Sequence, residues 1–352
     1  MYVDDAIVIT EGETDLQLVN AELTKASSLW RCKFAGGKKG PRVLPLMPTH
    51  GPPTLTAFDG GKLCGHVPTC VDQITLLGIL IDDELSFEPL LSKAVAEMQA
   101  IGLQLAAGMS SHGFGIPAMA SQFHSRVLGK ALHGCELLAS CRSGWGHVAK
   151  RLNDAQYFVA KAFLCCPHTA HLGSQVAALA ETRLLTRAST WLAKSIVMAR
   201  ARLACLPLDH SARLAGITIC QTGIPDTWMS SSLKILKKVL QVEYDLWDDL
   251  GAIPPEVLFQ EKSRKQFLSK YCRQYVLPKI KSLEHSWFGE QLAKLNSDGL
   301  VPYADLAPLR HCWTAREQWT LWPTSLWHMH RIWCVAKLLE EPLFFLTRRA
   351  TL

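Results

Sequence analysis

One pattern constrains the fold more than any other. From Ser86 onward, apolar residues recur three and four positions apart, and glycine or proline follows most of the runs. Such spacing places a single hydrophobic stripe on a helix. The clearest stripe predicts a helix over 86–108, capped at its start by Ser86 and ended by Gly108. By the same criteria, further helices are expected at 117–132, 151–164, 174–183 and 187–205.

The strand-forming segments lie in the first 85 residues. Two short apolar runs flank Asp4 and Asp5, which predicts a β-hairpin with both carboxylates at its tip. An amphipathic helix should follow over 14–30, and the apolar run 74–81 is typical of a buried strand. The expected fold class is therefore α+β, with a small N-terminal β portion followed by a predominantly helical remainder.

Composition narrows the class of protein. The chain has 352 residues, of which 48% are hydrophobic and 19% charged, so it can bury a core and is not a disordered polar chain. Its formal net charge of +6 permits a nucleic-acid partner without requiring one. No apolar run approaches the roughly 18 residues of a bilayer span, and Met1–Asp5 does not resemble a signal peptide. We expect a soluble, intracellular protein of two or three domains.

Twelve cysteines are scattered along the chain without a CxxC pair. In a chain of this kind, reduced and mostly buried thiols are the default. Two looser clusters could bind zinc, one made of Cys64, His66 and Cys70, and one of His311, Cys312, His328, His330 and Cys334. Neither has the spacing of a familiar zinc finger or knuckle, so scattered core cysteines and surface histidines are the favoured interpretation.

The segment Tyr2-Val3-Asp4-Asp5 carries the most chemical information. Adjacent carboxylates at a tight turn offer the hard oxygen ligands that Mg²⁺ prefers. In nucleotidyl transfer, such ions activate a hydroxyl group and stabilise the leaving pyrophosphate. A solvated Asp-Asp turn would explain the same four residues. The segments that follow must therefore decide between these interpretations.

Those segments occur in an order that resembles the reverse transcriptases of non-LTR retrotransposons. In that family, a YxDD motif is followed by a helix, a lysine, a strand with a Leu-Gly pair and the helical thumb. The corresponding elements here are Tyr2–Asp5, the helix 14–30, Lys38-Lys39, Leu77-Gly78 and the helix 86–108. The segment 131–136 is similar to a later thumb element that commonly reads Leu-Tyr-Gly, with His133 in place of tyrosine. The resemblance covers about residues 1–205.

This resemblance implies roles for six residues. Asp4 and Asp5 would bind Mg²⁺, and Tyr2 would lie near the primer terminus. Lys39, or its neighbour Lys38, would assist the departing pyrophosphate, although an ordinary solvated loop explains the two lysines equally well. Leu77 and Gly78 would grip the primer end, which is compatible with their also packing in a core strand.

The resemblance also implies an incomplete catalytic centre. The family's other essential carboxylate, and the fingers that hold the incoming nucleotide, precede the YxDD motif, whereas Tyr2 is the second residue here. Two-metal catalysis needs carboxylates from both strands. We therefore expect weak or absent Mg²⁺ binding and a fragment that does not polymerise alone.

Three regions follow from these patterns: a distal palm remnant over 1–85, a helical thumb-like region over 86–215, and a tryptophan-rich helical region over 216–352. Eight of the eleven tryptophans lie between Trp228 and Trp333. Basic residues at 234–238 and 262–273 could follow a nucleic-acid backbone. An amphipathic helix with its charged face in water is the preferred interpretation.

The leading hypothesis is thus a fragment of an RNA-directed DNA polymerase of retroelement origin, with RNA or an RNA–DNA hybrid as its partner. The alternative is a helical nucleic-acid-binding or interaction protein without catalysis. A third possibility is a translated remnant without a selected role. The sequence does not separate the last two, and it does not indicate an oligomeric state.

Overall fold

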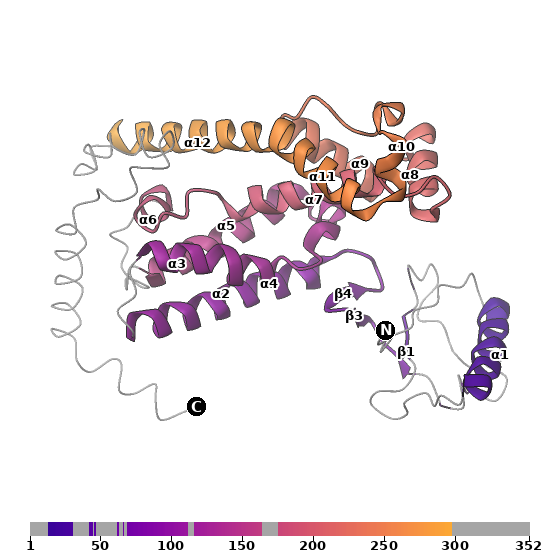
Figure 1. Cartoon of the computed structure of the whole chain (residues 1–352). Coiled ribbons are helices and arrows are strands. Elements are labelled where there is room, and N and C mark those ends of the chain that lie inside the picture. The colour runs from indigo at the N-terminus through magenta and orange to yellow at the C-terminus, as the bar shows by residue number, and fades with distance from the viewer. Residues whose placement is uncertain are drawn as a thin grey trace, which may run out of the picture.

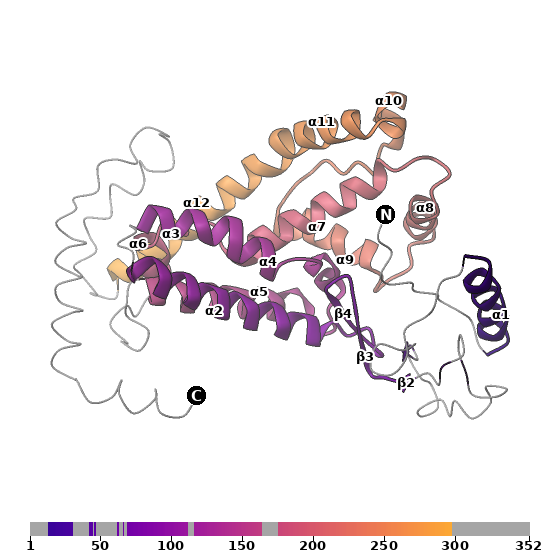
Figure 2. The ribbon, with the colours of Figure 1, turned by 60° about the horizontal axis from the view of Figure 1, so that its bottom comes forward.

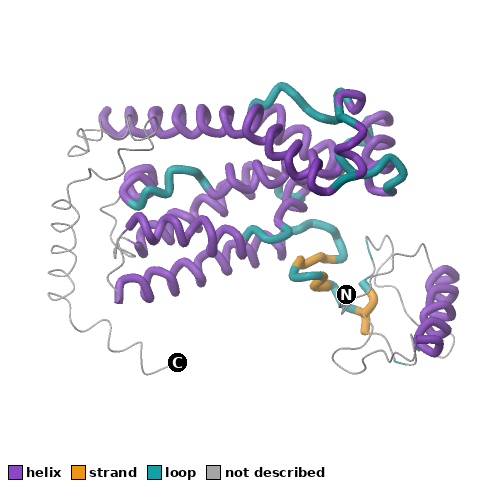
Figure 3. The backbone as a smooth tube through the Cα atoms, in the orientation of Figure 1, coloured by secondary structure: helices purple, strands orange, loops and turns teal. Residues whose placement is uncertain are grey.

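The computed structural model describes residues 13–30, 42–44, 46, 62, 66, 69–111, 116–163 and 175–297. Of the interpretable residues, 73% are helical, and a small antiparallel two-stranded sheet accompanies them. This confirms the expected α+β class, and Figure 3 shows how little of the described chain is strand. In this part of the chain, no helix combines the length and apolar character needed to cross a bilayer.

The first helix is α1, Glu13–Trp30, as the apolar spacing over 14–30 predicted. Two very short strands come next, β1 (Arg42–Val43) and β2 (Thr69–Cys70), and they pair in parallel. Figure 1 labels β1, and Figure 2 labels β2, near the antiparallel hairpin that follows. The hairpin, rather than this pair, connects to the helical body.

The apolar run 74–81 is not the single buried strand that its composition predicted. It forms a hairpin of β3 (Gln73–Leu76) and β4 (Ile79–Asp82), with Leu76 opposite Ile79. Leu77 and Gly78 form the two-residue turn, with φ angles of +47° and +86°. Positive φ at both central residues is the pattern of a type I′ turn, whose twist matches that of paired strands. The prediction was wrong because an apolar run reveals no turn when one turn residue is leucine.

The predicted thumb helix is α2, Glu88–Ser111, which begins beside the hairpin. Ser86 Oγ accepts a hydrogen bond from the Glu88 amide at 3.3 Å, so Ser86 does cap the helix. Gly108, however, does not end it. An interior glycine costs a helix only about 1 kcal/mol relative to alanine. That cost is too small to stop a helix of this length, and α2 continues for three residues.

Asp82 joins the end of the hairpin to the start of α2. Its buried carboxylate accepts hydrogen bonds from the Ser86 amide (2.9 Å), the Ser86 hydroxyl (2.6 Å) and the Phe87 amide (3.0 Å). Burial alone would raise the pKa of Asp82, but these hydrogen bonds outweigh it and hold the pKa below the ordinary 3.8. The charged form of Asp82 therefore stabilises this junction.

Replacing Asp82 by asparagine should lower the free energy of unfolding by about 1–2 kcal/mol at neutral pH, because charge-assisted caps are lost. Since the pKa is lowered in the folded state, the wild-type advantage is fully present above about 3.8 and is lost as the pH falls through the lower folded value. Urea unfolding at pH 7 and pH 3 should show the difference shrinking in acid. Asp72→Asn, at an exposed residue, is the control.

The helices predicted over 117–132, 151–164, 174–183 and 187–205 are observed with one different start, and the short helix η5 was not predicted. The observed helices are α3 (Ile116–Gln122), η4 (Phe123–Leu128), α4 (Gly129–Ala131), η5 (Cys135–Ser140), α5 (Gly144–Phe163), α6 (Gln175–Glu181) and α7 (Ala188–Ala204). Helix α5 begins seven residues before the expected 151. The Glu88 carboxylate accepts the Ser143 amide at 3.3 Å there, a cap supplied from a distant part of the chain.

The C-terminal described helices form a further layer. They are α8 (Ser211–Thr222), α9 (Trp228–Lys234), η6 (Ile235–Val239), η7 (Leu250–Ala252), α10 (Pro255–Phe259), α11 (Glu261–Tyr271), η8 (Cys272–Val276) and α12 (Leu277–Ser297). In Figures 1 and 2, α5 and α7 lie between α2 on one side and α11 with α12 on the other.

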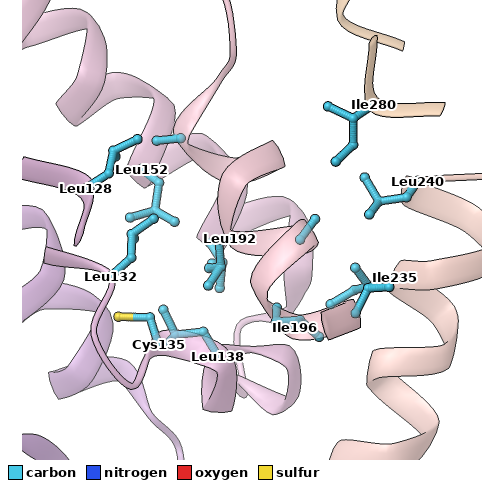
Figure 4. Packing of buried hydrophobic residues seen from close by; sticks show 14 of the residues in the cluster. Leu128, Leu132, Cys135, Leu138, Leu152, Leu192, Ile196, Ile235, Leu240 and Ile280 are labelled. Atoms are coloured by element: carbon cyan, nitrogen blue, oxygen red, sulfur yellow. The ribbon is translucent and has the colours of Figure 1, made fainter. Parts of the chain in front are cut away.

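The described parts of the predicted regions 86–215 and 216–352 share one hydrophobic core. Buried residues of a single cluster extend from Leu90 to Phe288. Figure 4 shows Leu192 and Ile196 of α7 between the earlier helices and Ile235 of η6. The structure therefore provides no core that belongs to the C-terminal described helices alone.

A buried ion pair reinforces this junction. Arg200 of α7 and Asp245 are each 2% exposed, and Arg200 Nη2 lies 2.7 Å from Asp245 Oδ2. Arg200 also donates to the Met229 carbonyl and the Ser232 hydroxyl, while the Trp247 indole donates to the Arg200 carbonyl. The guanidinium therefore ties α7 to α9 and to the loop after η6.

Candidate nucleic-acid interface

The predicted catalytic residues Tyr2, Asp4, Asp5 and Lys39 lie outside the described residues. Their roles and the Mg²⁺ site stay predictions. In the ranges that the structure describes, no three His, Cys, Asp or Glu side chains are grouped as they would be around a metal ion. Of the two cysteine–histidine clusters, only His66 and Cys70 fall within these ranges.

Leu77 and Gly78, by contrast, are described, and they form the tip of the β3–β4 hairpin. The Leu77 residue is 72% exposed, although its φ is +47°. A left-handed backbone costs a residue with a side chain about 1–2 kcal/mol. Asparagine or glycine is the usual residue at such a position. An exposed leucine here gains nothing from burial, so the fold alone does not explain it.

Leu77→Asn should therefore stabilise the protein, raising the free energy of unfolding by about 1 kcal/mol, because Asn-Gly is the preferred type I′ turn pair. Chemical denaturation monitored by circular dichroism would measure the change. Leu208→Asn is the matched control, since Leu208 is 57% exposed and its φ is not positive. An equal gain in both variants would contradict the strain at Leu77.

Two side chains from the helical body hold the hairpin tip. The ring Nε2 of His133 hydrogen-bonds the Leu77 carbonyl at 3.3 Å. The Lys93 ammonium, from α2, donates to the Gly78 carbonyl. Since the two donors come from separate segments, the tip is fixed in position as well as in conformation.

Gly134 lets the hairpin approach the body closely. Its φ is +70°, and a Cβ added there would lie 2.3 Å from Ile79 Cγ1. Only a glycine leaves room for β4 at this point. His133-Gly134, which takes the place of the family's Tyr-Gly, therefore contacts Leu77-Gly78, 56 residues earlier. The structure brings together two motifs that the sequence shows only in order.

The outward face of α2 carries no charge. Its exposed residues are Ser92, Ala96, Ala100, Leu103, Gln104, Ala107 and Gly108. The helix has three charged residues, Glu88, Lys93 and Glu97. Two of them already form hydrogen bonds within the protein, because Glu88 accepts from the Ser143 amide and Lys93 donates to the Gly78 carbonyl. A strip of mostly small, uncharged side chains, with Leu103 and Gln104 among them and the half-buried Glu97 beside it, thus extends from the hairpin along α2.

Basic residues lie on the two helical segments that pack beside α2. Arg126 of η4 and Lys130 of α4 are exposed on one, and Lys150 is exposed on α5. Arg151 of α5 reaches the strip itself, because its Nη1 donates to Ser92 Oγ at 3.1 Å. An uncharged strip with cations beside it suits a nucleic-acid duplex, which presents phosphates on either side of a groove.

No family model, curated protein or solved structure matches this chain. The resemblance to reverse transcriptases thus rests on the sequence motifs, and the geometry of the hairpin tip stands beside it as an independent observation.

Proposed function

We propose that the chain is the distal palm and thumb of a non-LTR retrotransposon reverse transcriptase, an RNA-directed DNA polymerase, and does not polymerise by itself. One observation carries the proposal. The exposed turn Leu77-Gly78, where the resemblance puts the primer grip, is held by His133-Gly134, where it puts a second thumb motif. A chance likeness of two short motifs gives no reason for them to contact each other.

The geometry also supports a physical role in holding a duplex. A hairpin tip fixed by two hydrogen bonds presents an apolar side chain at one end of the α2 strip. Small uncharged side chains allow a close approach to sugars and base edges, while neighbouring cations reach the phosphates. Such contacts position a duplex without reading its sequence. Binding should therefore be sequence-independent and weaken steeply with salt.

The catalytic part of the proposal comes from the resemblance alone. Asp4 and Asp5 would bind Mg²⁺, Tyr2 would lie near the primer end, and Lys39 would assist the leaving pyrophosphate. The metal would activate the primer hydroxyl and neutralise developing charge. Catalysis also requires a carboxylate from a second strand, which the resemblance places upstream of the YxDD motif.

The 352 residues alone should therefore extend no primer on an RNA template with Mg²⁺ and nucleotides. A gel assay of primer length tests this, with a complete reverse transcriptase as the positive control. Extension above background that is lost in an Asp4→Ala variant would show a complete catalytic centre and overturn the fragment hypothesis.

Leu77→Asn separates function from stability at the hairpin tip. If Leu77 contacts the primer end, the variant should bind a labelled RNA–DNA hybrid about five- to tenfold more weakly, which corresponds to about 1 kcal/mol, although its fold is more stable. Leu208→Asn should bind as the wild type does. Unchanged binding by Leu77→Asn would remove the primer-grip role.

The alternative is a helical nucleic-acid-binding protein without catalysis. Hybrid binding that is insensitive to Leu77 but lost when Arg126 and Lys130 become glutamine would support this alternative.

A further inference from the structure

The positive charge of the chain is concentrated in one short stretch. Residues 261–281 contain seven lysines and arginines against a single acid, Glu261, whereas the whole chain carries a net charge of +6. The basic residues are Lys262, Arg264, Lys265, Lys270, Arg273, Lys279 and Lys281. This stretch forms α11, η8 and the start of α12.

One face of this stretch is hollowed. An open cavity of about 670 Å³ is lined by Lys265, Gln266, Ser269, Lys270, Arg273 and Gln274. All six residues are exposed, and every side chain ends in an ammonium, guanidinium, amide or hydroxyl group. We call this surface the α11 groove.

Most of these cations are not neutralised within the described chain. Lys265 pairs with Glu261 at 2.7 Å in an exposed ion pair. Lys262, Lys270 and Arg273 form no ion pair or side-chain hydrogen bond with any residue that the structure describes. Like charges close together on a helix are mildly destabilising. An anionic partner would remove that repulsion.

The lining favours phosphates over a protein surface. The six lining residues have polar or charged ends, while most of the area that they turn to the groove belongs to their alkyl stems. Protein interfaces depend on buried aromatic and aliphatic anchors, which such stems do not supply. Protein–nucleic-acid interfaces are more polar and more positively charged. Lys265 and Arg273 are eight residues apart, or about 12 Å along a helix. Cations spread over that length can contact successive phosphates of one extended strand.

The groove is separate from the hairpin tip. In Figures 1 and 2, α11 lies on the opposite side of α7 from α2. We propose that the α11 groove binds the phosphate backbone of a nucleic-acid strand, as a second contact distinct from the duplex site at the hairpin. The inference does not depend on a polymerase origin.

Salt-dependent binding of a labelled single-stranded uridine homopolymer to the full chain tests this inference. Each phosphate contact on a single strand contributes about 0.7 to the slope of log affinity against log salt. The double variant Lys270→Gln with Arg273→Gln should therefore lose about 1.4 of that slope and bind several-fold more weakly at low salt. The control, Lys234→Gln with Lys238→Gln, removes the same charge from exposed positions of α9 and η6 and should keep the wild-type slope.

Equal losses in the two double variants would reduce the effect to overall charge and overturn the proposal, as would an unchanged slope in the groove variant. An acidic peptide that binds the wild type more tightly than RNA, and loses affinity in the groove variant, would assign the groove to a protein instead. Leu77→Asn should bind the uridine homopolymer with wild-type affinity. The hybrid assay therefore tests the proposal for the hairpin tip, the homopolymer assay tests the proposal for the α11 groove, and either can fail without the other.

Discussion

Replacing Asp245 by alanine is expected to lower the free energy of unfolding by about 3–5 kcal/mol, the usual consequence of removing one partner from a buried ion pair. Arg200 would keep its charge in a site where it is only 2% exposed. Its Nε and Nη2 groups, which now donate to Asp245 at 3.0 and 2.7 Å, would lose their acceptor. Guanidinium chloride unfolding would measure the loss.

Asp248→Ala provides a nearby control. Asp248 pairs with Lys237 at 3.1 Å, but the Asp248 side chain is 60% exposed, and exposed pairs contribute at most about 1 kcal/mol. The double variant Arg200→Met with Asp245→Leu should recover part of the loss, since it leaves no buried charge. A loss at Asp245 as small as that at Asp248 would show that water reaches the Arg200 site.

The same unfolding curves test whether the thumb-like and C-terminal regions unfold as separate domains. Because Arg200 joins α7 to helices after residue 215, the described helices should unfold together. A single transition that Asp245→Ala shifts as a whole is expected. Two resolved transitions would instead support separate thumb-like and C-terminal domains.

The helices could be predicted because their signal is local. Apolar spacing places α1, the run α3–η4–α4, α6 and α7 within a few residues of their observed bounds. A stripe of this kind depends only on the residues of the helix itself, so it can be recognised without knowing which distant residues pack against it. The α+β class follows from the same signal.

Features set by distant residues could not be predicted in this way. The start of α5 depends on Glu88, 55 residues earlier in the chain. Lys93 donates to the backbone carbonyl of Gly78. Because every residue has a backbone carbonyl, the sequence does not indicate this contact. Asp82 could have been found, because a carboxylate four residues before Ser86 is well placed to cap the start of α2.

The candidate site also combines features that the sequence indicates locally with features that depend on distant residues. Leu77 and Gly78 were selected by their resemblance to a family motif, but their place in a turn, rather than within a strand, depends on the pairing of β3 with β4. The need for glycine at position 134 is evident only in the folded structure, where Ile79 lies beside it. Tyr2, Asp4, Asp5 and Lys39 stay predictions.

Gly134→Ala is expected to be the most damaging single change at the hairpin. The new methyl group would lie 2.3 Å from Ile79 Cγ1 and 2.7 Å from Ile79 Cδ1. Overpacking of this kind costs about 1–3 kcal/mol. The φ of +70° adds the left-handed backbone cost of about 1–2 kcal/mol for a residue with a side chain. We expect a total loss of about 2–5 kcal/mol in the free energy of unfolding.

Gly223→Ala separates these two contributions. Gly223 also has a positive φ, +64°, but an added Cβ would meet no atom within 4 Å. It should lose only the backbone part, about 1–2 kcal/mol. Combining Gly134→Ala with Ile79→Ala should relieve the overlap but not the backbone strain. If Gly134→Ala were no worse than Gly223→Ala, close packing of the hairpin would not be the reason for glycine.

The binding of the RNA–DNA hybrid decides whether this packing matters for function. Gly134→Ala can relieve the overlap by rotating the Ile79 side chain or by moving β4 and the attached turn away from Gly134. Movement of the turn would also disturb the His133 and Lys93 hydrogen bonds. Hybrid affinity should then fall by more than in Leu77→Asn, because the whole tip is displaced rather than one side chain. Gly223→Ala, far from the hairpin along the chain, should leave affinity unchanged. A folded Gly134→Ala protein with wild-type hybrid affinity would show that the position of the tip is irrelevant to binding, and the primer-grip proposal would then be wrong.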